Sequence, residues 1–198
     1  YLHELNSTFF HNKERLYIGG VNFRDKRTGW RQYTFSVVLA EKTSSGMQEY
    51  AEPYYRNIFM QGFLADLYLR PSCYACPSKK GKSGSDLTIA DYWGVRRVLP
   101  EIDDDKGVGL VLVNTDKGRI AYQGLDMMSY TTDYEMAQMD NGGFKEKVAI
   151  HPDRSYFFKK LDCTQRVSKL IHSCVLRPQL PKRKRILLLI KRYIMFGL

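Results

Sequence analysis

Residues 16–40 read LYIGGVNFRDKRTGWRQYTFSVVLA, and this stretch predicts the first supersecondary structure of the chain. The apolar run at 16–23 indicates a strand, and the polar segment DKRTG at 25–29 indicates a turn in which Gly29 can adopt a positive φ. Residues 30–40 have the period of two that a half-buried strand requires. Its large side chains fall on alternate positions: Tyr33, Phe35, Val37 and Leu39. We therefore expect a β-hairpin.

The rest of the chain alternates between further strand-like and helix-like segments. In chain order we expect a polar loop at 41–46, a helix at 54–67, a loop at 70–86, strands at 87–93 and 107–114, a short helix at 117–128 and a helix at 153–176. The helix at 54–67 should bury one face, formed by Tyr55, Phe59, Phe63 and Leu67. The prediction is an α+β fold, with a mixed β-sheet flanked by helices and an inserted cysteine-containing loop.

The net charge of +10 is distributed unevenly. Residues 1–162 carry 22 basic and 21 acidic side chains, whereas residues 163–198 carry nine Lys/Arg and no Asp/Glu. A nucleic-acid-binding face would need clustered basic residues on the body, so we expect no nucleic-acid partner. The charge predicts a body at 1–162 and a basic helical tail at 163–198.

The end of the tail, residues 182–198, predicts an amphipathic helix with Lys and Arg opposite an apolar face. This apolar run is too short to span a bilayer, which takes about 20 residues. Such a helix suits a partner protein or an anionic membrane surface, and packing on its own domain is the alternative.

The chain has four cysteines and neither a secretory signal nor a run of 18 apolar residues, so we expect free thiols and a cytoplasmic location, with peripheral membrane association through the tail as an option. Cys163 and Cys174 would lie about 16 Å apart along a continuous helix, which is too far for one cluster. We expect both to pack in the core. The chain starts at Tyr1, which suggests a fragment that lacks an N-terminal part.

Cys73 and Cys76 form a C-x-x-C motif in a loop, followed at once by Pro77. This spacing can turn both sulfurs toward one metal centre, and the Cys-Pro step is typical of ferredoxin cluster motifs. The motif also serves zinc sites and redox dithiols. A zinc ribbon would need a second cysteine pair or a histidine pair, and a dithiol would need a strand before the motif and a helix after it. Two unliganded cysteines remain a further alternative.

The sequence around this motif resembles a known family. The segment RPSCYAC at 70–76, a Lys/Gly/Ser loop and SDLTIADYWG at 85–94 resemble the C-terminal domain of coenzyme F-420 hydrogenase/dehydrogenase β subunits. Three flanking segments are also similar to that family: NFRDK at 22–26, DDDKG at 103–107 and HPDR at 151–154. The resemblance covers residues 15–162.

The resemblance implies a flavoprotein subunit that holds FAD and a 4Fe–4S cluster and passes electrons to coenzyme F-420 or another acceptor. Cys73 and Cys76 would be cluster ligands that point into one site, and the remaining ligands would belong to the missing N-terminal part. A ferredoxin-type module is the implied electron donor. The isolated chain should not hold a stable cluster and should be inactive.

Other residues near the motif are cofactor-binding candidates. Lys79, Lys82 and the neighbouring Lys80 can face a phosphate of FAD or an acidic electron carrier, or can form a solvated loop. Asp86, Asp91 and Trp93 can orient the cluster or line a flavin pocket, or can serve packing and turn capping. We thus expect the electron-transfer part of an iron–sulfur/FAD oxidoreductase. The alternative is a non-enzymatic assembly or scaffolding module that keeps the fold without a complete redox site.

Overall fold

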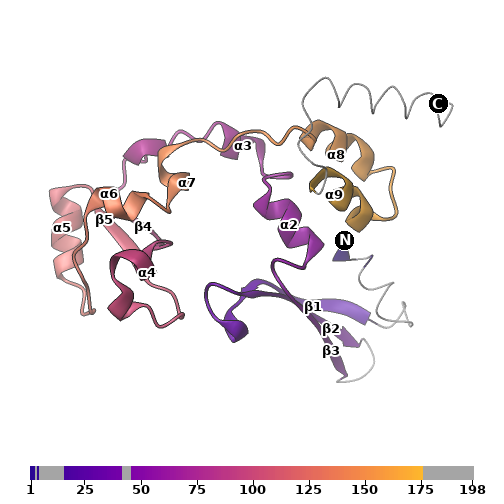
Figure 1. Cartoon of the computed structure of the whole chain (residues 1–198), viewed down its shortest axis with the longest axis horizontal. Helices are drawn as coiled ribbons and strands as arrows, with labels where there is room; N and C mark the ends of the chain where they lie inside the picture. The colour runs from indigo at the N-terminus through magenta and orange to yellow at the C-terminus, as the bar shows by residue number, and fades with distance from the viewer. Residues whose placement is uncertain (3, 5–15, 42–45, 176–198) are drawn as a thin grey trace.

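A computed structural model describes residues 1, 2, 4, 16–41 and 46–175, and all structural statements below concern these residues. The fold is α+β, as predicted, but the single mixed sheet was wrong. Two separate antiparallel sheets occur instead, one of three strands and one of two (Figure 1). Among the described residues, no helix is both long enough and apolar enough to cross a membrane.

The larger sheet has the order β1 (Leu16–Asp25), β2 (Thr34–Glu41) and β3 (Met47–Pro53). β1 and β2 form the predicted hairpin, and the turn between them contains the 3-10 helix η1 (Lys26–Thr28) and Gly29 at φ +112°. β3 was not predicted. It pairs with β2 in antiparallel register over its whole length, from Thr34 opposite Pro53 to Ala40 opposite Met47.

The apolar face predicted for β2 is confirmed, because Tyr33, Phe35, Val37 and Leu39 are all buried, but Thr34 and Ser36 on the opposite face are buried as well. They pack with Met60 of α2 (Ile58–Leu64). Asn57 caps this helix, with its side-chain oxygen accepting from the Met60 N–H at 3.0 Å. The helix is shorter than predicted and its buried face differs, since Tyr55 and Phe63 are about half exposed.

The predicted helix at 153–176 is two helices, α8 (Arg154–Leu161) and α9 (Val167–Val175). Both pack with the chain after α2, around the fully buried Leu67. Cys174 lies in this core, as predicted, but Cys163 is exposed because it falls in the break between the helices. Residues 167–175 thus belong to the body, and the predicted helix at 182–198 lies outside the described residues.

The smaller sheet pairs β4 (Leu87–Asp91) with β5 (Gly109–Val113). Around it lie α4 (Val95–Val98), η3 (Pro100–Ile102), α5 (Asp116–Gln123), α6 (Tyr134–Gln138) and α7 (Gly142–Lys145). Its core is small and contains Tyr92, Val95, Leu110 and Ala137. The short elements α3 (Pro71–Tyr74) and η2 (Lys79–Gly81) connect the two halves of the molecule (Figure 1).

The turn of the first hairpin also contacts the smaller half directly. The Trp30 N–H donates to the Asp105 carbonyl at 2.7 Å, and the Arg31 guanidinium pairs with Asp103 at 2.6 Å. Gly107 adopts φ +98° beside Trp30, where a Cβ would come within 2.4 Å of the indole ring. The acidic segment at 103–105 is therefore part of the junction between the halves.

Candidate functional site

The C-x-x-C motif lies on an ordered turn. Pro71 occupies the first turn of α3, where its missing N–H costs nothing, and the Cys73 N–H donates to the Arg70 carbonyl at 2.9 Å. Cys76 follows the helix directly. Both cysteines are free and half-buried, so the thiols are held at the surface without being enclosed.

Tyr74, one of the two residues between the cysteines, fixes this turn to the body. The Tyr74 hydroxyl donates to the Asp66 carbonyl at 2.9 Å, and the Arg154 guanidinium lies 5.3 Å from the centre of the Tyr74 ring. Arg154 also stacks on Phe158 and donates to the Leu69 carbonyl at 2.9 Å. The turn is therefore attached to α8 through an arginine that bridges two aromatic rings.

The loop after the motif is attached to the smaller half. The Lys79 ammonium donates to the Gly143 carbonyl of α7, and Gly81 approaches the Phe144 ring. Lys80 adopts a left-handed conformation at φ +58°, which lets the short η2 turn close. Lys82 is exposed. Of the two predicted phosphate-binding lysines, Lys79 is thus engaged with the backbone and Lys82 faces solvent.

The donor set around Cys73 and Cys76 bears directly on metal binding. Within the part of the chain that the structure describes, no group of three or more His, Cys, Asp or Glu side chains could hold a metal ion. Two thiols on one turn fit half of the ligand set of a 4Fe–4S cluster, which takes four cysteines. A complete site would need ligands from elsewhere.

Asp86 directly precedes β4 and contacts the N-terminal end of α5. Its carboxylate accepts from the Thr115 hydroxyl at 2.6 Å and pairs with Lys117 at 3.3 Å. Both contacts lower the pKa of Asp86, and the hydrogen bond from Thr115 has the larger effect. Thr115 in turn caps α5 by accepting from the Gly118 N–H at 3.1 Å. The carboxylate thus serves the junction of β4 and α5.

Asp91 and Trp93 come together with residues of the first hairpin. The Asp91 carboxylate pairs with Arg24 at 2.5 Å, and the indole ring of Trp93 lies 4.3 Å from that of Trp30, centre to centre. The Arg24 guanidinium lies 4.7 Å from the Trp93 ring, 5.1 Å from Trp30 and 5.2 Å from Tyr33. We call these five residues the arginine cage.

The cage explains an unusual feature of Arg24. Its Nε and Nη2 atoms are buried and have no hydrogen-bond acceptor among the described residues. The π faces of three rings stand in for acceptors and stabilise the cation. Sequence reasoning singled out Asp91 and Trp93 but missed Arg24 and Trp30. The only sequence signal for these two residues was that segments 22–26 and 85–94 both resemble the same protein family.

The five predicted cofactor-binding residues therefore occupy three settings: the η2 loop for Lys79 and Lys82, the start of α5 for Asp86, and the arginine cage for Asp91 and Trp93. They do not line one pocket. Their roles toward a cofactor remain a prediction.

Comparison of the chain with protein-family models, with curated proteins and with solved structures gave no match.

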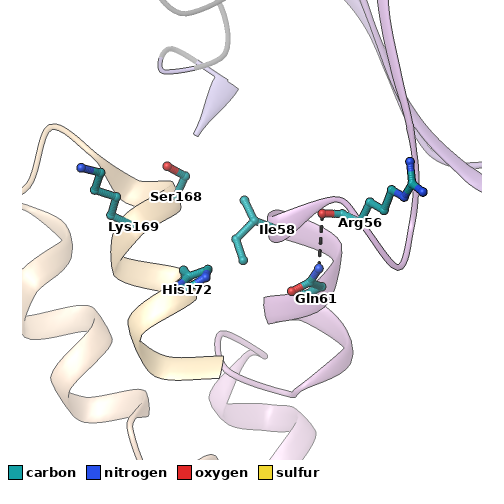
Figure 2. A pocket seen from close by; sticks show the side chains of 6 residues that line it. All are labelled: Arg56, Ile58, Gln61, Ser168, Lys169 and His172. Carbon is teal, nitrogen blue, oxygen red and sulfur yellow. Dashed lines mark hydrogen bonds between the residues drawn. The ribbon is translucent and has the colours of Figure 1, made fainter. Parts of the chain in front are cut away.

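A separate pocket of about 730 Å³ lies between α2 and α9 (Figure 2). Its lining residues are Arg56, Ile58, Gln61, Ser168, Lys169 and His172. The polar groups that could fix a ligand are already engaged. The Gln61 amide donates to the backbone carbonyls of Tyr55 and Arg56, and the Ser168 hydroxyl donates to Glu4 at 2.5 Å. The remaining basic side chains, Arg56, Lys169 and His172, are exposed, so this pocket offers positive charge without a built site.

Proposed function

We propose that this chain is the electron-transfer part of an iron–sulfur/FAD oxidoreductase that resembles coenzyme F-420 hydrogenase/dehydrogenase β subunits. In this proposal Cys73 and Cys76 supply two thiolate ligands of a 4Fe–4S cluster. The remaining ligands come from an N-terminal part of the polypeptide or from a ferredoxin-type partner. The bound cluster would relay single electrons to a flavin.

The observation that carries the proposal is the anchored C-x-x-C turn. Its cysteines are free and half-buried, and the turn is fixed from both sides, by the contact of Tyr74 with Arg154 of α8 and by the bond from Lys79 to α7. A ligand turn held in this way loses little conformational freedom when a cluster binds, because its backbone is already ordered. An ordinary surface loop has no need of such anchoring.

A second candidate function is a non-enzymatic assembly or scaffolding module. The specific observation in its favour is that Lys79, Asp86, Asp91 and Trp93 all make internal contacts that stabilise the fold. A module that keeps the fold without the redox site would retain these contacts.

The test is anaerobic purification of the natural polypeptide, together with its partner where one is required, followed by iron, sulfide and flavin analysis. We expect about four irons per cluster, FAD, and loss of the iron in Cys73→Ser and Cys76→Ser. Cys163→Ser is the matched control, because this cysteine is exposed and lies far from the motif in sequence. Wild-type protein without iron, or iron that survives in both variants, would contradict the proposal and favour the scaffolding module.

A further inference from the structure

Within the described residues, strand β5 has a partner strand on one side only. In the two-stranded sheet, the Tyr92 N–H donates to the Val108 backbone carbonyl, and the Asn114 N–H donates to the Asp86 backbone carbonyl, both at 2.9 Å. These bonds identify the even-numbered residues as the hydrogen-bonded pairs of the ladder. The odd-numbered residues of β5, Gly109, Val111 and Val113, therefore direct their N–H and C=O groups away from β4.

These edge groups have no hydrogen-bond partner within the described part of the chain. An exposed row of unpaired backbone groups is a template for another strand, and natural proteins usually block it with charges, proline or a covering segment. β5 has the sequence GLVLV, which contains none of these blocking residues. The edge of β5 thus has unpaired backbone groups and no side chain that would block the pairing of another strand.

A groove of about 620 Å³ follows this edge. Every residue from 108 to 114 lines one wall, and every residue from 127 to 134 lines the other. Residues 127–133 have no regular secondary structure, so they do not pair with β5. Tyr92 contributes to the groove, and its hydroxyl is hydrogen-bonded to Thr132 at 3.0 Å, which holds the far wall in place.

The groove is more apolar than polar, and the one charge among its described lining residues is negative. Met128 is 83% exposed, Tyr130 52% and Val113 40%, although all three are large side chains that gain free energy when covered. Asp133 is the only charged residue among the described residues that line the groove. The lining thus suits an extended segment with apolar side chains and one basic side chain.

We propose that β5 and the facing residues 127–134 form a docking groove for an extended segment of a partner protein, which adds to the sheet as a third strand. Backbone bonds to Gly109, Val111 and Val113 would supply affinity, and the apolar walls with Asp133 would supply specificity. A second copy of this chain fits less well. If the β5 strand of the second copy entered the groove, the β4 strand on its other edge would occupy the space of residues 127–134 of the first copy. This inference does not depend on the redox proposal.

The decisive variant is Val111→Pro. Because the Val111 N–H points away from β4, proline removes a donor from the groove and leaves the β4–β5 ladder intact. Ile89→Pro is the matched control, since Ile89 is the partner of Val111 in the register and its N–H points to the opposite free edge. Both variants should keep the far-UV circular dichroism of the wild type.

The probe is a synthetic peptide, Lys-Val-Thr-Val-Thr-Val, blocked at both ends and titrated into ¹⁵N-labelled protein. We expect shifted and exchange-protected amides at Gly109, Val111 and Val113, with at least about a tenfold loss of affinity in Val111→Pro and none in Ile89→Pro. Asp133→Lys, which does not alter the backbone, should also weaken binding and provides a second test should Val111→Pro unfold.

Three results would overturn the proposal. They are no binding at millimolar peptide, equal loss of affinity in Ile89→Pro and Val111→Pro, and perturbed amides that lie away from the groove. Concentration-dependent dimerisation in sedimentation experiments that disappears in Val111→Pro would replace the partner protein with a second copy.

Discussion

The two halves of the molecule bury their apolar side chains to different extents. The half that contains β1–β3, α2, α8 and α9 buries Phe35, Leu67 and Ile171 almost completely. The half that contains β4, β5 and α4–α7 has only two strands, and it leaves Ile89 76% and Met128 83% exposed. A two-stranded sheet is marginal by itself. We therefore expect the smaller half to depend on contacts with the larger half, and its exposed apolar surface is where we propose that a partner docks.

The halves also differ in charge. Residues 86–145 contain eleven Asp/Glu and six Lys/Arg, within a chain whose net charge is +10. Residues 86–145 thus form an acidic subdomain, although the charges of residues 1–162 taken together nearly cancel. The difference shows that charge is informative for each structural unit and misleading when it is averaged over units.

The comparison predicts that core truncations differ in cost between the halves. Phe35→Ala should lower the free energy of unfolding by about 3–5 kcal/mol, because Phe35 is fully enclosed. Leu110→Ala should cost about 2 kcal/mol, the low end for such a change, because the adjacent groove lets its surroundings relax. Urea unfolding followed by far-UV circular dichroism measures both. A larger loss for Leu110→Ala would show that the smaller half is the better packed one.

The arginine cage gives a way to separate the halves. Arg24→Met keeps the length of the side chain but removes the cation from three aromatic rings and from Asp91, so we expect a loss of about 2 kcal/mol. Asp91→Asn should cost less than about 1 kcal/mol, because the carboxylate is 44% exposed. Thermal and urea denaturation test both values. Equal losses would mean that the ion pair, and not the aromatic rings, holds the junction.

The smallest expected effect is a pH dependence within the first hairpin. Hydrogen bonds from Arg27 lower the pKa of Asp25 to about 2. A carboxylate with a lowered pKa in the folded state contributes stability above its unfolded value of 3.8, and the contribution is lost as the pH falls toward 2. In Asp25→Asn the urea midpoint should be lower at pH 5 and should change less between pH 4 and pH 2. Asp116→Asn, at a side chain that is 95% exposed, is the control and should follow the wild type.

Local patterns predicted the elements whose side chains follow one clear period. β2 was recognised because Tyr33, Phe35, Val37 and Leu39 form one apolar face, and this face is buried. β3 was missed because its sequence, MQEYAEP, is polar and lies at the sheet edge, where solvent covers much of it. The break between α8 and α9 has no proline or glycine. Its signal is Thr164, whose hydroxyl accepts from the Arg166 N–H at 3.2 Å and so ends one helix before the next begins.

The candidate site was predictable only in its local part. The C-x-x-C spacing and the following Pro77 located the cysteine turn, since both act over a few residues. The partners of Asp91 and Trp93 could not be inferred, because Arg24 and Trp30 lie in another half and meet them only when the two halves dock. Contacts of this kind depend on tertiary structure, which a period in the sequence does not encode.

The neighbouring indoles of Trp30 and Trp93 have an optical consequence. They are the only two tryptophans of the chain, and their rings lie 4.3 Å apart across the junction. At this separation their electronic transitions couple, so docking of the two halves should give a band of two opposite signs in the circular dichroism spectrum. The protein therefore carries a built-in, label-free reporter for the contact between its halves, whereas its intrinsic emission cannot distinguish one half from the other.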